Sequence, residues 1–292
     1  MYTDFNNTQE LVNKISDHNQ GQPGLQLVLL SDSHQHQAED IMTQLKAKDI
    51  DFIGAVFPGL LVGDALKDQG AVIHKLPSSF PPIVAHLGED SIKWETSLPT
   101  LPQDNDEEYS AFIFVDSQAE SISMLFDKIY HEYGSTINYF GAGVGNSDLA
   151  PGPCVFSNSG IYQDAAIVVI CKAESETSVK HGWRRLHGPF VATRTSGRVI
   201  KEINWEPAIE VYRKYLPERL HQYLKPDDPG EFYQKISLFP FAIVNEGCED
   251  VVRDVIGVTE KGELICISDV PQNSIMHILT ADMDSLIAAA RS

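Results

Sequence analysis

Hydrophobic residues in the first half of the chain follow the same layout twice. An apolar run at residues 25–30 precedes a segment with helical spacing, and a second apolar run follows at residues 52–56. Residues 111–115, another helically spaced segment and residues 137–140 repeat that order. Each layout is typical of a β-strand, an α-helix and a second, parallel strand. Because these runs are continuously apolar rather than alternating, we expect sheets that are covered on both faces.

The connection between the two layouts, residues 77–108, is rich in proline and ends in the acidic run at residues 104–108. Such a composition favours a solvated loop over a packed element. After residue 153 the apolar runs become shorter and turn residues separate them, a pattern that predicts an antiparallel meander. Its expected strands are residues 154–157, 165–171, 190–194 and 199–203.

The last third of the chain combines helices with short strands. A helix is predicted from Glu206-Pro207 to the residue before Pro217, because proline suits the first turn of a helix and interrupts later turns. A final helix is predicted after Asp282, whose side chain can cap its amino end. Strands are expected at residues 241–244, 251–258, 264–268 and 275–279. Together these patterns predict an α/β fold of mixed β-sheets with flanking helices.

Composition narrows the classes of partner. The 292 residues include 22 Lys and Arg against 41 Asp and Glu, a formal charge of −19. This charge repels nucleic-acid phosphates and anionic lipids, so we expect neither nucleic acid nor a membrane as partner. The amino terminus lacks a basic segment followed by an apolar one, and the longest aliphatic run, residues 165–171, is too short for a bilayer. A cytoplasmic protein is expected.

Enzymatic motifs are missing from the sequence. It contains no GxSxG, P-loop, HExxH or kinase signature. Asp32 and Asp116 follow equivalent strands, where they either cap the next helix or hold a cation, as a metal-dependent hydrolase would require. The four cysteines have no CxxC spacing and are expected to be buried free thiols: Cys154, Cys171, Cys248 and Cys266.

The region from His181 to Leu216 resembles a known family. The His-Gly-Trp-Arg start at residues 181–184, the strand at residues 197–200 and the helix start at residues 207–212 are similar to the FIST (F-box and intracellular signal transduction) family. The likeness extends over about residues 25–292 and includes three later segments, at residues 252–258, 262–264 and 269–271.

This resemblance implies a FIST N-type sensory domain at residues 1–180 and a FIST C-type domain at residues 181–292, the latter shortened at its end. Members of the family bind a small ligand and regulate a histidine kinase or a cyclic-di-GMP enzyme. One branch binds haem b and responds to nitric oxide. The resemblance therefore implies a sensor without enzymatic activity, with haem b as the candidate cofactor. A haem-free sensor of a small molecule, such as an amino-acid-like ligand, is the alternative.

Gly141, Gly143 and Gly145 are candidates for the ligand cavity. They follow an expected strand, but they lack the G-x-G-x-x-G spacing and the helix that a dinucleotide site requires. The resemblance places this segment in a loop that lines the sensory cavity.

Gly54, Val56 and Phe57 occupy the matching position in the first layout. The apolar side chains of Val56 and Phe57 suit a hydrophobic ligand or a planar cofactor better than an amino acid, which needs fixed charge partners. Packing in the core is the other interpretation, and the sequence does not decide between them.

His181, Trp183 and Arg184 form the most distinctive cluster. An imidazole can bind haem iron, an indole offers a flat apolar surface, and a guanidinium pairs with a carboxylate or propionate. His181 is therefore the candidate iron ligand. The structural alternative is a hydrogen bond between His181 and the backbone, with Trp183 in the core. Arg253, beside Asp254 in an expected strand, is a further candidate through the resemblance.

Overall fold

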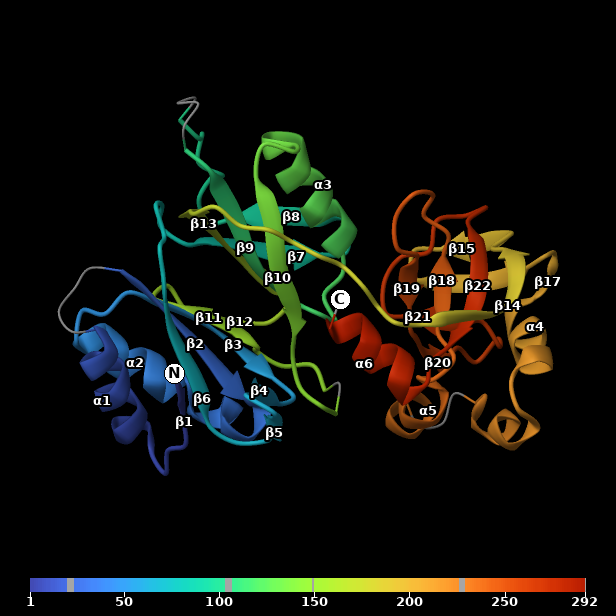
Figure 1. The fold of residues 1–292 in the computed structure, drawn as a ribbon, viewed down its shortest axis with the longest axis horizontal. Helices are drawn as coiled ribbons and strands as arrows, with labels where there is room; N and C mark the ends of the chain where they lie inside the picture. Colours follow the sequence, from blue (N-terminus) through green and yellow to red (C-terminus); the bar gives the residue numbers. More distant parts are fainter. Residues whose placement is uncertain (20–23, 103–106, 149, 226–228, 292) are drawn as a thin grey trace. The chain divides into compact units, whose positions relative to one another are not determined.

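The computed structural model describes residues 1–19, 24–102, 107–148, 150–225 and 229–291. The chain divides into two compact units, Met1–Thr177 (unit 1) and Ser178–Ser292 (unit 2), and each has its own hydrophobic core (Figure 1). No described helix is long and apolar enough to cross a bilayer.

The first sheet of unit 1 contains the first predicted strand–helix–strand layout. Its strands, in spatial order, are β1 (Tyr2–Thr3), β6 (Ala71–Leu76), β2 (Leu25–Ser31), β3 (Phe52–Phe57), β11 (Val155–Ser157) and β12 (Ile161–Tyr162). β2 and β3 are parallel, as predicted. The outer face is covered by α1 (Thr8–Asn19) and α2 (Ala38–Ala47), and the short helix η1 (Asp32–Gln37) precedes α2 (Figure 1).

The second sheet contains the second predicted layout. Its strands, in spatial order, are β10 (Asn138–Val144), β9 (Tyr109–Asp116), β13 (Ala165–Lys172), β7 (Ile83–Gly88) and β8 (Ser91–Trp94). β9 and β10 are parallel and are joined by α3 (Ile122–Tyr133), which covers the outer face. A separate hairpin pairs β4 (Leu60–Val62) with β5 (Ala65–Lys67).

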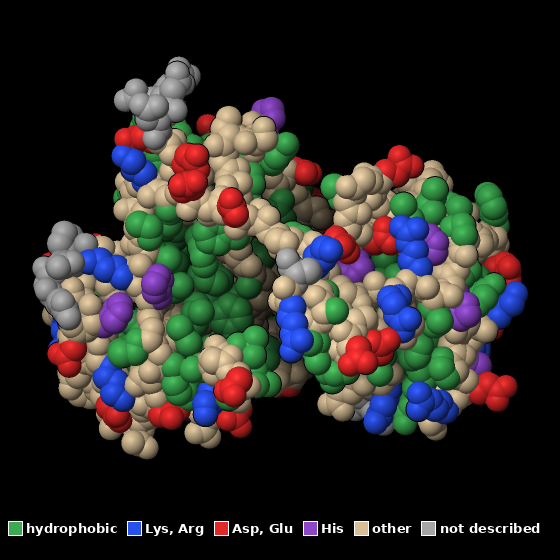
Figure 2. All heavy atoms as spheres, in the orientation of Figure 1, with side chains coloured by type: hydrophobic (Ala, Val, Ile, Leu, Met, Phe, Trp, Pro, Cys, Tyr) green, Lys and Arg blue, Asp and Glu red, His purple; other side chains and the backbone are tan. Residues whose placement is uncertain are grey.

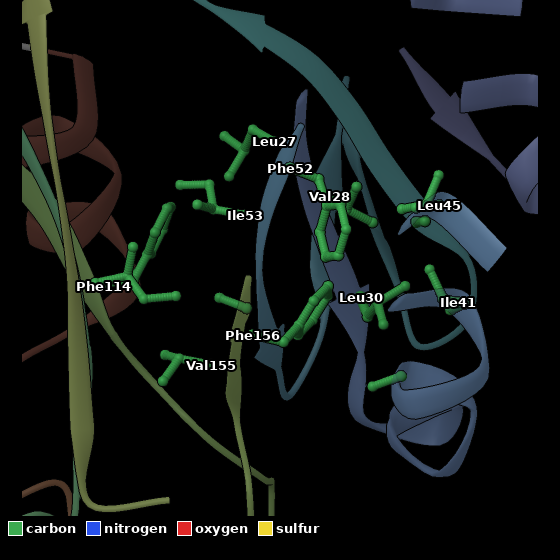
Figure 3. Packing of buried hydrophobic residues seen from close by; sticks show 14 of the residues in the cluster. Leu27, Val28, Leu30, Ile41, Leu45, Phe52, Ile53, Phe114, Val155 and Phe156 are labelled. Carbon is green, nitrogen blue, oxygen red and sulfur yellow. The ribbon is translucent and has the colours of Figure 1, made fainter. Parts of the chain in front are cut away.

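Unit 1 has four layers: α1 and α2, the first sheet, the second sheet, and α3. This arrangement forms because the strands are apolar on both faces. Val28 and Leu30 of β2 point toward Leu45 of α2, whereas Ile53 of β3 points toward Phe114 of the second sheet (Figure 3). A separate core layer joins the outer face of the second sheet to α3. The expectation of sheets that are covered on both faces is confirmed.

The expected loop at residues 77–108 is wrong for its middle part, which forms β7 and β8. β7 pairs with β13 inside the second sheet, and Ile83, Ala85 and Leu87 are buried. The alternation of these apolar residues outweighs the prolines and acidic residues on either side. In the acidic run, Asp104, Asn105 and Asp106 lie outside the described residues.

The expected antiparallel meander is also wrong. β11 lies in the first sheet and β13 in the second, whereas the next two strands belong to unit 2. Turn residues do reverse the chain between these runs, but they do not determine the strand with which each run pairs.

Unit 2 contains two antiparallel sheets around one core. One sheet has the order β14 (Arg184–Val191), β22 (Ile275–Thr280), β18 (Phe241–Ile243) and β19 (Val251–Arg253). The other has the order β15 (Arg194–Ser196), β16 (Val199–Ile203), β21 (Leu264–Cys266) and β20 (Val255–Val258), with β17 (Glu206–Pro207) paired to β16. The strand expected at residues 251–258 is therefore two strands of different sheets.

The helices of unit 2 are α4 (Ala208–Tyr215), the short η2 (Glu218–Tyr223), α5 (Pro229–Ile236) and α6 (Met283–Arg291). α4 and α6 lie where helices were predicted. Asp282 Oδ1 accepts the Ser285 N–H at 2.8 Å, which confirms the predicted cap of α6. Mixed sheets with flanking helices, the predicted fold class, describe the molecule.

Candidate functional site

The inner faces of the two sheets of unit 1 leave an apolar hollow beside β10, which we name the inter-sheet trough. Figure 2 shows hydrophobic side chains gathered in this hollow, between β10 and β2. The strand registers place five partly exposed side chains on these inner faces: Leu29, Phe57, Phe112, Phe140 and Ala142.

Aromatic rings form much of the wall of the trough. The Phe112 ring lies 4.6 Å from that of Phe140 and 5.1 Å from that of Phe114, measured between centroids. Phe57, from the opposite sheet, meets Phe114 edge to face at 6.1 Å. Edge-to-face contacts are favourable for aromatic pairs. These contacts hold the rings in place and leave an apolar aromatic surface open to a ligand.

Hydrogen bonds between the two sheets close one end of the trough. The Gly145 N–H donates to Val56 O at 2.9 Å, which joins the end of β10 to β3. Two residues later, the Ser147 N–H donates to Asp32 Oδ2 at 3.0 Å. The segment after β10 is therefore held at the carboxyl ends of β2 and β3.

Two glycines allow close packing, Gly141 beside the trough and Gly54 on the helix-covered face of the first sheet. A Cβ on Gly141 would lie 1.8 Å from Ile113 O, and a Cβ on Gly54 would lie 2.0 Å from the ring of Phe156. Gly141 and Gly143 are part of β10 and not of a loop after it, because the strand runs to Val144.

The carboxylates of Asp32 and Asp116 accept hydrogen bonds from backbone N–H groups and do not cap a helix. Asp116 is buried, and its two oxygens accept the N–H groups of Gln118 at 3.0 Å and of Asp164 at 2.9 Å. The capping expectation is wrong, because Asp32 lies inside η1, whose N-cap is Ser31, and the N-cap of α3 is Ser121. Within the described part of the chain, no three His, Cys, Asp or Glu side chains are grouped as a metal site would require.

The buried cysteines are poor nucleophiles. Burial, together with the neighbouring Asp116, raises the pKa of the Cys154 thiol well above its usual range. Burial raises the pKa of Cys171 to about 11 and that of Cys266 to about 12. All three are therefore protonated near neutral pH, where a thiolate would be needed for attack. All four cysteines are free, as predicted, but Cys248 is exposed and not buried.

The predicted cluster at the start of unit 2 is engaged in contacts within that unit. His181 Nδ1 accepts the Trp183 N–H at 2.9 Å, and its Nε2 lies 3.1 Å from Glu249 Oε2, without the geometry of a hydrogen bond. Arg184 donates to Asp282. All three predicted side chains of this cluster belong to the start of β14 or the residues just before it.

The Arg253 guanidinium donates hydrogen bonds to backbone carbonyls of unit 2. Its Nε donates to Asp269 O at 2.8 Å, and its Nη1 donates to Val252 O at 3.0 Å. Burial lowers the pKa of this guanidinium, which remains charged as arginines in proteins do. The side chain therefore ties β19 to the segment before β22.

The predicted site residues fall into two groups. Gly54, Val56, Phe57, Gly141, Gly143 and Gly145 lie together in unit 1, whereas His181, Trp183, Arg184 and Arg253 lie in unit 2. Phe57 lines the trough and Gly145 helps to close it. The buried Val56 pairs with Leu30 in the strand register, so its side chain faces the helices and not the trough.

Sequence reasoning missed most of the trough wall. Leu29, Phe112, Phe140 and Ala142 lie in segments that were predicted as strands or glycine-rich loop, but none was assigned to the site. The available signal was the pair Phe112 and Phe114, which alternate with smaller residues and so mark one face of a strand.

Family models match nearly the whole chain. The FIST N domain matches residues 26–206, and the FIST C domain matches residues 208–292. The chain belongs to the FIST family. FIST domains are sensory domains of signal transduction. A search of curated proteins and a search of solved structures both gave no match.

The sequence boundary of the two FIST domains differs from the structural one. The FIST N match ends at residue 206, but residues 178–206 belong to unit 2. Their strands β14 and β16 pair with β22 and β21, which lie within the FIST C match.

His181 does not fit the role of a haem ligand in this FIST protein. Because Nδ1 accepts the Trp183 N–H, the proton of the neutral ring lies on Nε2. Neither nitrogen then offers a free lone pair to iron. Arg184, the candidate partner of a propionate, is paired with Asp282.

Proposed function

We propose that this FIST protein senses a small, uncharged molecule with a flat apolar body, which binds in the inter-sheet trough of unit 1. The observation that carries this proposal is the partly exposed aromatic wall formed by Phe57, Phe112 and Phe140. Pockets for small molecules are typically concave and apolar with few polar groups. Burial of a ring against these three residues supplies most of the binding free energy.

The charge of unit 1 disfavours an anionic ligand. Unit 1 contains 25 Asp and Glu but only 8 Lys and no Arg, so it carries −17 of the formal charge and leaves −2 for unit 2. An anion approaching unit 1 is therefore repelled. An amino-acid-like ligand also needs fixed partners for its ammonium and carboxylate groups, and the five side chains of the trough are apolar.

Sensing requires a recipient of the signal. We propose a histidine kinase or a cyclic-di-GMP enzyme, because the FIST family acts in signal transduction and the resemblance implies these partners. The ligand must favour one of two conformations of the sensor to change the activity of the partner. We propose that ligand entry shifts β10 relative to β3, to which it is joined by the hydrogen bond from the Gly145 N–H to Val56 O.

The experiment is binding of Nile red, an uncharged planar dye whose fluorescence rises in apolar surroundings. Phe112→Ala should weaken its binding about tenfold, the equivalent of about 1.4 kcal/mol, because the central ring of the wall is removed. Phe126→Ala is the matched control, since Phe126 lies on α3 and is 43% exposed. Equal dye affinity in both variants, with both proteins folded, would refute the trough as the binding site.

A further inference from the structure

β10 is the end strand of its sheet, and only one of its edges is paired. In the spatial order of the second sheet, β10 has β9 as its sole neighbour among the described strands. The two strands are parallel and in register from Asn138 to Val144. In a parallel ladder, alternate residues direct both backbone groups to the same neighbouring strand.

One hydrogen bond between β10 and the segment after β9 shows which residues face outward. Val144 O accepts the Ser117 N–H at 3.0 Å, so Val144 and, by alternation, Ala142 bond to β9. The N–H and C=O groups of Gly141 and Gly143 therefore point away from β9. Gly145 continues this series, and its N–H indeed leaves the sheet to reach Val56 O at 2.9 Å.

The outward groups of Gly141 and Gly143 are open to an incoming chain. Both residues are exposed, and neither has a hydrogen-bond partner on its outer edge among the described residues. Neither has a side chain that would keep another backbone at a distance. The two residues are two positions apart, which is the spacing at which a further strand forms its bonds.

This edge lacks the usual protection against strand pairing. Proteins guard exposed edges with charged residues, proline or a covering segment. Asn138–Val144 contains neither a charged residue nor a proline, although unit 1 has 33 charged side chains. An uncharged, exposed edge of this kind is suited to binding a strand.

We propose that the outer edge of β10 is a docking site for an extended segment of a basic partner protein, which adds to the second sheet as a further strand. Backbone bonds to Gly141 and Gly143 would give affinity, as in other complexes formed by strand addition. Side chains on the inner face of the added strand lie beside Phe140 and Ala142 and are therefore apolar. Because unit 1 carries a formal charge of −17, basic residues on either side of the partner's segment would favour its binding.

The test uses a ten-residue peptide with a Val-Thr core and two lysines at each end, added to protein labelled with 15N at glycine. The Gly141 and Gly143 amide signals should shift, and their exchange with solvent should slow about tenfold. The amides of Gly63 and Gly262, in turns of the two units, serve as internal controls. Binding of the peptide without any change at Gly141 and Gly143 would overturn the proposal.

A second peptide separates backbone pairing from hydrophobic adsorption. It has the same side chains, but every amide of its core is N-methylated, so it cannot pair as a strand. Its affinity should be at least tenfold lower, and equal affinity for the two peptides would overturn the proposal. In the Phe112→Ala protein, the first peptide should still slow solvent exchange of the Gly141 and Gly143 amides. The test of strand addition is therefore independent of the test of ligand binding in the trough.

Discussion

Gly141 shows how one residue without a side chain fixes the path of a strand. A Cβ at this position would lie 1.8 Å from Ile113 O, so β10 would have to move away from β9. We expect Gly141→Ala to destabilise the protein by more than about 2 kcal/mol, the range of substitutions that force a clash with backbone. Urea unfolding measures this change.

Gly63→Ala is the control for that substitution. Gly63 lies at φ +63° in the turn of the β4–β5 hairpin, and nothing lies within 4 Å of its Cβ position. Its substitution costs only the strain of a left-handed backbone, about 1 kcal/mol. A loss at Gly141 no larger than the loss at Gly63 would contradict the clash.

Asp254 predicts a dependence of stability on pH. Burial raises the pKa of this carboxyl above its ordinary value of 3.8, so the folded state binds its proton more tightly than the unfolded state. The contribution of Asp254 to stability is present below that value and is lost as the pH rises through the raised pKa. Above the raised pKa, the full cost of a partly buried charge is present.

Asp254→Asn should therefore raise the unfolding temperature at pH 7 and have a much smaller effect at pH 4. Thermal melts at both values measure this difference. Glu260→Gln is the control, because it removes one negative charge from an exposed turn of the same unit. If both variants respond alike at the two pH values, general charge reduction explains the result and burial of Asp254 does not.

At the scale of elements, the parts predicted well were those whose signal is local. The runs at residues 25–30 and 52–56, with helical spacing between them, determined β2, α2 and β3, because each element has enough apolar residues to define its period. β7 was missed because its six residues lie beside prolines that dominate the composition of the segment. A short strand between loop-like sequences leaves too little pattern to recognise.

The candidate site was less predictable than the fold. The side chains of His181 and Trp183 can do more chemistry than phenylalanine, but the His181 ring already contacts the Trp183 backbone N–H and Glu249 within unit 2. The trough is made of ordinary apolar residues from strands far apart in the sequence. Phe57 and Phe114 meet only because two sheets stack, and stacking is not encoded in either segment alone.

At the scale of the whole molecule, the segment between the units predicts a site of proteolysis. Residues 174–183 form no helix or strand, and Val179 is 76% exposed. Exposed backbone without regular structure is where proteases cut most readily. Brief trypsin treatment should cleave after Lys180, and mass spectrometry should find two fragments that meet there. Early cuts within the strands of either unit would contradict two separately folded units.

The pairing of β14 with β22 and of β16 with β21 has a practical consequence for anyone who wishes to express part of this protein. A gene fragment that stops at residue 206, the end of the FIST N match, would encode β14 and β16 without β22 and β21, the strands that pair with them. Such a product would expose unpaired strand edges and apolar surface to water and would tend to precipitate. A stop codon after Thr177 leaves every strand of the first unit with its natural neighbours.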